Sequence, residues 1–219
     1  MYEQTGPNLG ATIILLHEAI SRSLEVTKLK CKEYILPSGK PDQATQDSFI
    51  LYVTTMGMVI NAHHIGEDDI IFPKLRSALP QAPFEELANE HKIMDEVLAE
   101  FRQTVETSSG DFFSSLLDTV TRLIALWLPH IAKEKQYIYS PEITAALMSP
   151  EEHVKMLQET SAHAMEQGNP ALMLPFVLRN LNPEDRKAFA RILPPEMTQT
   201  LIPTVWKPQW APMLPFMLE

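Results

Sequence analysis

The chain lacks several features on which common classes of protein depend. Its 219 residues include one cysteine and only seven glycines, and 28 acidic residues outnumber 18 basic ones. A single cysteine, Cys31, excludes an intramolecular disulfide and is typical of a reducing compartment. The net charge of −10 and the scattered Lys and Arg residues argue against a nucleic-acid partner, because phosphate binding depends on clustered basic side chains.

Features of membrane proteins are also scarce. No run reaches the roughly 18 apolar residues that a membrane span needs, and the N-terminus lacks a basic segment followed by an apolar one. The chain also has no basic face that would bind a membrane surface. We therefore expect a soluble, cytoplasmic protein without a membrane partner.

The residues that are abundant favour helices. Leu, Ala, Glu and 11 methionines are frequent, 45% of the chain is apolar, and no segment of useful length alternates between apolar and polar residues. These observations predict an all-α protein. A chain of this length can bury one principal core and carry a smaller appendage.

Four long segments show helical periodicity, at about residues 8–33, 42–69, 84–105 and 113–137. Proline and glycine interrupt the chain between several of them, and the connections are short. Short connections favour an up-down-up-down four-helix bundle, which we expect over residues 8–145. Pro129 lies inside the fourth segment and predicts a kink or bulge immediately before His130.

The C-terminal part differs in composition. Of the 18 prolines, 11 lie between Pro141 and Pro215, and shorter helical patterns cover about residues 150–167, 170–180, 183–193 and 195–205. We expect residues 146–219 to form a Pro-rich helical extension. It is too apolar to remain free, so it should pack on the bundle, on a partner subunit in a homodimer, or around a substrate.

Polar residues interrupt the apolar stripe of each predicted bundle helix. Every helix carries a histidine where an apolar residue is expected, and the second and fourth carry a glutamate one turn later. Buried imidazoles and carboxylates are costly unless they are hydrogen-bonded, ion-paired or bound to metal. In a bundle all six groups could meet near the central axis; they are His17, His63, Glu67, His91, His130 and Glu134.

Four imidazoles and two carboxylates without a thiolate suit iron, manganese or zinc better than copper(I) or calcium. Two carboxylates suggest two bridged ions, roughly 3.5 to 4 Å apart as in other two-metal sites. We assign His17 and His63 to one ion and His91 and His130 to the other, with the two glutamates as bridges. Two octahedral iron ions would keep positions for an oxo or hydroxo bridge and for an incoming molecule such as dioxygen.

The residue pattern resembles the hemerythrin-like (HHE cation-binding) domain over about residues 8–145. The resemblance implies a four-helix bundle with a non-haem diiron centre that binds or reacts with dioxygen, and it places the same six residues at ligand positions. The matching motifs are His17, His63-His64-Ile65-Gly66-Glu67-Asp68, Ile71-Phe72-Pro73, Glu90-His91 and His130-Ile131-Ala132-Lys133-Glu134.

The pattern departs from that of the oxygen carriers at two positions. Asp95 stands where the carriers have a second histidine on the third helix, which makes simple reversible oxygen carriage less assured. His64 has no fixed counterpart in the carriers. We regard His64, Asp95 and Tyr137 as candidate extra or outer ligands. The remaining polar residues near the motifs or in the extension are expected at the surface and without a role, namely Glu18, Glu90, His153 and His163.

Three functions are consistent with these residues. The first is a diiron protein that binds dioxygen in oxygen or redox sensing, storage or iron handling. The second is a diiron oxygenase or oxidase that activates dioxygen or peroxide on a small organic substrate, with the extension forming part of the pocket. The third is a metal-free interaction module in which the His/Glu pairs are ordinary helical i,i+4 pairs and the extension is a dimer interface.

Overall fold

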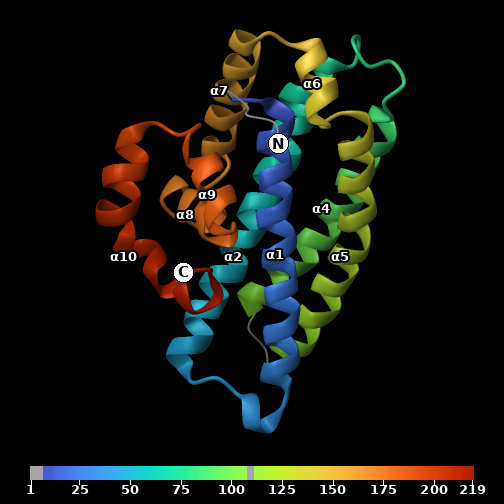
Figure 1. The fold of residues 1–219 in the computed structure, drawn as a ribbon. Coiled ribbons are helices and arrows are strands. Elements are labelled where there is room, and N and C mark those ends of the chain that lie inside the picture. Colours follow the sequence, from blue (N-terminus) through green and yellow to red (C-terminus); the bar gives the residue numbers. More distant parts are fainter. Residues whose placement is uncertain (1–6, 108–110) are drawn as a thin grey trace.

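Every regular element of the described structure is a helix. The computed structural model describes residues 7–107 and 111–219, and no strand occurs in these ranges. The all-α prediction is therefore confirmed. Figure 1 shows the long helices lying side by side, with the shorter C-terminal helices beside them. The long helices are α1 (Leu9–Ile35), α2 (Gln43–Gly66), α4 (Phe84–Thr107) and α5 (Phe112–Tyr137).

The four long helices enclose a common interior. Helix α1 packs on α2 and α5, and α4 packs on the same two helices from the other side. Local signals determine where the first two begin, because the Asn8 side chain accepts a hydrogen bond from the Ala11 N–H at 2.9 Å, and the Asp42 side chain accepts one from the Thr45 N–H at 2.8 Å. The predicted bounds of these helices agree with the structure to within a few residues.

A π-helical turn follows α2. It spans Glu67–Ile71, and the Phe72 N–H donates to the Glu67 carbonyl five residues earlier. One residue, Phe72, separates this turn from Pro73. Proline has no N–H to donate, and in a regular α-helix its ring clashes with the carbonyl group four residues earlier. Glu67 and Ile71 are the buried residues of this turn. Helix α3 (Phe72–Leu75) continues from this turn.

Of the kink or bulge predicted beside Pro129, the bulge is absent. All residues of α5 are described, and the helix continues through Pro129 as an α-helix. A π-helical turn begins at Glu67 instead, and Pro73, near the start of α3, follows two residues after the end of this turn. The prediction of a bulge at Pro129 was wrong, and a kink there stays a prediction.

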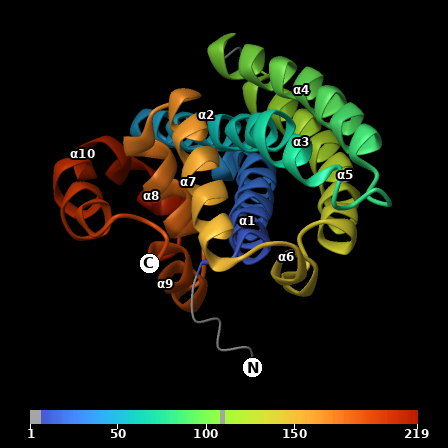
Figure 2. The same cartoon turned by 90° about the horizontal axis from the view of Figure 1, so that it is seen from above.

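The C-terminal extension packs on one side of the bundle, over α1 and α2 (Figure 2). One core cluster combines bundle side chains such as Phe49 and Trp127 with extension side chains such as Phe176 and Phe216. The division of the chain near residue 145 and a homodimer through the extension remain predictions. Helix α6 (Pro141–Leu147) crosses the predicted boundary. The elements of the extension after it are α7 (Pro150–Glu166), α8 (Pro170–Asn180), α9 (Pro183–Ala190), a π-helical segment (Met197–Val205), α10 (Lys207–Trp210) and a 3-10 segment (Ala211–Phe216).

A buried polar network anchors the extension. The Tyr52 hydroxyl of α2 donates to the Asn180 side-chain oxygen at 2.8 Å, and Arg22 of α1 donates to the same oxygen. Arg22 also donates to the Phe216 carbonyl at 3.2 Å. These bonds join α1, α2, α8 and the C-terminal segment, so the extension has a defined position against the bundle.

Helix α5 is long and apolar enough, by length and composition, to cross a membrane. It packs against α1 and α4, and its side chains Leu123 and Trp127 are fully buried in the protein core. Core helices of soluble proteins share this length and composition.

Candidate metal centre

The structure brings the six candidate residues together between the four long helices. His17 comes from α1, His63 from α2, His91 from α4, and both His130 and Glu134 from α5, while Glu67 is the first residue of the π-helical turn. Each of the six is at most 4% exposed.

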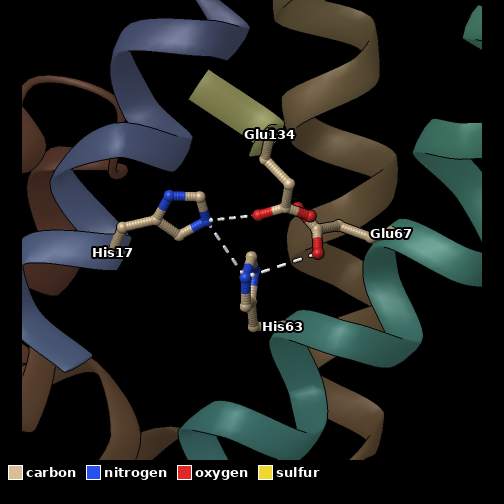
Figure 3. Close-up of side chains that lie close together, drawn as sticks. All are labelled: His17, His63, Glu67 and Glu134. Carbon is tan, nitrogen blue, oxygen red and sulfur yellow. Dashed lines mark hydrogen bonds and ion pairs between the residues drawn. The ribbon is translucent and has the colours of Figure 1, made fainter. Parts of the chain in front are cut away.

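One group of donors consists of His17, His63, Glu67 and Glu134, whose side chains point toward one another in Figure 3. The Nε2 atoms of His17 and His63 are 3.2 Å apart. The His17 Nε2 lies 3.3 Å from Glu134 Oε2, and the His63 Nε2 lies 3.4 Å from Glu67 Oε2. The donor atoms of this group therefore surround a single point.

A second group shares both glutamates and adds His91 and His130. The Nε2 atoms of these two histidines are 2.9 Å apart. The His130 Nε2 lies 3.2 Å from Glu134 Oε1, and the His91 Nε2 lies 3.4 Å from Glu67 Oε2. Since Glu67 and Glu134 belong to both groups, each could contact two cations at once.

The two glutamates have unsatisfied buried oxygens. In the described part of the chain, none of the four carboxylate oxygens of Glu67 and Glu134 has a hydrogen-bond partner. A buried carboxylate without a partner is strongly unfavourable, and an unexplained unsatisfied group often indicates a missing ion. All four histidines also direct Nε2 toward these oxygens. The donor set therefore fits a pair of cations.

Outer carboxylates orient the histidines of the second group. The His91 Nδ1 lies 3.0 Å from Asp68 Oδ1, and the His130 Nδ1 lies 2.9 Å from Glu90 Oε2. A carboxylate at Nδ1 keeps the proton there and leaves Nε2 with a free lone pair. Lys133 in turn donates to Glu90.

Sequence reasoning missed both outer carboxylates. Glu90 was expected to be solvated, but its side chain is only 26% exposed and contacts His130. Asp68 was named only as the last residue of a matching motif, and its side chain contacts His91. Their adjacency to Glu67 and His91 was the available signal, but the direction of each side chain depends on how α4 packs against its neighbours.

Burial shifts the protonation of the cluster. It raises the pKa of Glu67 to about 8, assisted by the charge of Glu134, and it raises the pKa of Glu134 to about 8. Burial also lowers the pKa of His17 well below its usual value. Burial would lower the pKa of His91 too, but the hydrogen bond with Asp68 and the nearby Glu67 carboxylate raise that pKa to about 10. Without a cation, the glutamates therefore retain protons near neutral pH.

The candidate extra ligands lie outside the two donor groups. The His64 ring stacks on His91 with centroids 4.3 Å apart, and the His64 Nδ1 lies 3.3 Å from Asp95 Oδ1. The His64 Nε2 is buried without a hydrogen-bond partner among the described residues. Burial lowers the pKa of His64 to about 4. Asp95, about half exposed, contacts His64 and is in neither donor group.

The tyrosine beside the cluster is Tyr139, whereas Tyr137 is only partly buried among apolar side chains. Tyr139 is fully buried, and its ring centroid lies 6.0 Å from that of His17. Burial, together with the charges of Glu67 and Glu134, raises the pKa of Tyr139 well above its usual value. Helical spacing pointed to Tyr137, but α5 ends at that residue and the chain changes direction there.

The other polar residues have different environments. His153, expected at the surface, is only 4% exposed, and its Nδ1 accepts a hydrogen bond from the Leu9 N–H at 3.2 Å. That expectation was wrong because α7 packs against the start of α1. His163 is partly exposed and lies 3.0 Å from Asp69. Burial raises the pKa of the Cys31 thiol to about 12, so this residue is a poor nucleophile.

The comparison with protein families agrees with this geometry. Residues 34–140 match the model of the hemerythrin HHE cation binding domain. The predicted resemblance to the hemerythrin-like domain is therefore confirmed over residues 34–140. The match includes five of the clustered residues and begins after His17, which α1 brings to the same place. No curated protein and no solved structure matches the chain.

Proposed function

We propose that the protein is a soluble, cytoplasmic, non-haem diiron protein that binds dioxygen. In this proposal the four long helices form an up-down-up-down bundle of the hemerythrin type. His17 and His63 would hold one iron, His91 and His130 would hold the other, and Glu67 and Glu134 would be shared between them. The observation that carries the proposal is the pair of donor groups sharing two buried glutamates whose oxygens lack hydrogen-bond partners.

The donor chemistry supports iron over the alternatives. Imidazole and carboxylate without thiolate suit iron, and also manganese or zinc, which we consider less suitable for a site that binds dioxygen. A pair of iron ions supplies redox chemistry toward dioxygen or peroxide. Four protein donors for each ion would leave coordination positions for small molecules.

The surrounding residues prepare the site for this chemistry. Asp68 and Glu90 hold the imidazoles of His91 and His130 with Nε2 facing the centre. Trp127 is fully buried and meets the His17 ring edge to face, with centroids 5.4 Å apart. Its Nε1 donates to the Ser21 hydroxyl at 2.9 Å, so the indole is held in place and excludes water from that side.

Metal analysis combined with an optical spectrum tests the proposal. We expect about two irons per chain, as a two-metal site requires, and an oxo-bridged absorption that changes reversibly when the reduced protein meets air. Protein made under iron-replete conditions that contains no metal would instead support the metal-free interaction module.

The outer carboxylates should tune the affinity for metal. We expect Glu90→Gln to weaken iron binding about 10- to 100-fold, because outer partners of metal-bound histidines typically have effects of this size. Competition with a chelator of known affinity measures the change. Glu86→Gln is the matched control, since both Glu86 and Glu90 contact Lys133 but only Glu90 contacts His130. Equal affinities in the two variants would contradict the orienting role of Glu90.

A second candidate function is enzymatic. The same centre could activate dioxygen or peroxide on a small organic substrate, and the supporting observation is an apolar cavity between the bundle and the extension that His63 helps to line. Substrate-dependent oxygen consumption would favour this function. Reversible oxygenation without product formation would favour the first.

A further inference from the structure

A cavity of about 120 Å³ lies where the extension meets the bundle. Helices from both parts of the chain contribute to its wall, and Figure 2 shows α7 and α8 lying beside α1 and α2. An apolar cavity of roughly 150 Å³ in another protein is large enough to hold benzene. The apolar side chains that line it include Leu16, Val59, Leu157, Ala164, Val177 and Phe189.

The lining determines the charge of a suitable ligand. Among the described residues, the wall contains no Lys, Arg, Asp or Glu side chain. An ion would therefore lose its hydration without gaining a partner of opposite charge, which is strongly unfavourable. An uncharged, mainly apolar molecule would instead replace contacts with water by contacts with the wall.

One residue of the wall, Thr160, carries a buried polar atom without a partner. The hydroxyl oxygen of Thr160 is buried, and it has no hydrogen-bond partner among the described residues. The Thr160 methyl group packs on α2, where a Cβ added at Gly66 would lie 3.0 Å from it. A rotation of the Thr160 side chain would bring its oxygen to the cavity surface. A hydroxyl or carbonyl group on the ligand would then satisfy this oxygen or its proton.

The cavity adjoins the candidate metal centre. His63 lines the cavity, and its Nε2 lies 3.4 Å from Glu67 Oε2 inside the cluster. Ile71, at the end of the π-helical turn that begins with Glu67, lines it as well. Helix α7 is held against this region, because His163 pairs with Asp69 at 3.0 Å and Glu159 pairs with Lys74.

We propose that this cavity binds a small uncharged molecule of about the size of phenol, oriented by one hydroxyl or carbonyl group that bonds to Thr160. The bundle and the extension form the site together, which gives the extension a role in ligand binding. Binding of this molecule does not require metal. A role for the bound molecule as a substrate of the metal centre rests on the proposed function.

Phenol and benzene are suitable probes because they differ by the single hydroxyl group. Ligand-observed NMR titration of the full chain should detect binding of both. We expect Thr160→Val to weaken phenol binding about three- to tenfold, the value of one net hydrogen bond, and to leave benzene binding unchanged. Equal effects on the two probes would overturn the assignment of Thr160.

A cavity-filling variant tests the location of the site. Ala164→Phe places a ring in the cavity and should weaken binding of both probes at least about tenfold, because a filled cavity has no room for them. Ala162→Phe is the matched control, since Ala162 is exposed on the same helix and does not line this cavity. Folding of each variant is checked by circular dichroism. Should Ala164→Phe fail to fold, the phenol-to-benzene ratio in Thr160→Val decides the question.

The titrations are run on iron-loaded and on chelated protein. Binding of the probes to a chain that never takes up iron would contradict the proposed function and support the cavity. Iron uptake without binding of either probe would overturn the cavity and leave the proposed function in place.

Discussion

Glu67→Gln should strip the metal from the protein while leaving the metal-free fold intact. Glu67 belongs to both donor groups, so a neutral amide there removes a bridge from both proposed ions. We expect the metal content to fall from about two ions per chain to less than half of that. Elemental analysis of protein made under iron-replete conditions measures the change. Glu18→Gln is the control, because Glu18 is an exposed acid beside His17.

The stability of the same variant shows whether Glu67 is a metal ligand or a residue that stabilises the metal-free fold. Burial raises the pKa of Glu67 from 4.5 to about 8, so in chelated protein its contribution to folding is favourable below pH 4.5 and is lost as the pH rises through 8. Glutamine does not ionise. At pH 9 the chelated variant should therefore melt at a higher temperature than the chelated wild type. A variant that keeps both ions, or that melts lower at pH 9, would contradict the assignment.

Removing the metal should lower the melting temperature strongly, and this decrease should be larger at higher pH. A ligand at 1,000 times its dissociation constant stabilises a protein by about 4 kcal/mol per site, and 1 kcal/mol shifts the melting temperature of a chain of this size by roughly 2–4 °C. Two sites predict a difference of about 15–30 °C between loaded and chelated protein at pH 8. Scanning calorimetry of both forms measures it.

The pH dependence of this difference follows from the two glutamates. Their pKa values of about 8 mean that protons compete with the metal below that pH, and binding should release protons at pH 7. The difference in melting temperature should narrow toward pH 5. Chelated Glu67→Gln treated with iron serves as the control and should show little difference at any pH. A difference that widens toward acid pH would contradict proton competition at Glu67 and Glu134.

Much of the fold was predictable because its signals are local. Asn8 and Asp42 cap their helices through bonds to residues three positions later, and the apolar periodicity of each long helix is read directly from the chain. The six clustered side chains were found for a related reason. A polar residue in an apolar stripe is conspicuous in sequence, because burial without a partner is costly.

The predictions that failed concern the directions in which side chains point and the residues that they contact. The π-helical turn at Glu67 depends on Pro73 and on packing, and the apolar periodicity of the sequence reveals neither effect. Glu90 and His153 look like surface residues in sequence, yet each is covered by a helix distant in the chain. Tyr139 lies beyond the last residue of α5, where helical spacing no longer applies.

The sequence by itself determined that this protein is helical and that histidines and glutamates interrupt its apolar stripes, because both properties depend on residue spacing within single helices. Only the tertiary structure decided that Asp68 and Glu90 orient two of the histidines, that Tyr139 lies beside His17, and that the extension encloses a cavity against His63. These features arise between helices, where the packing of whole surfaces determines which side chains meet.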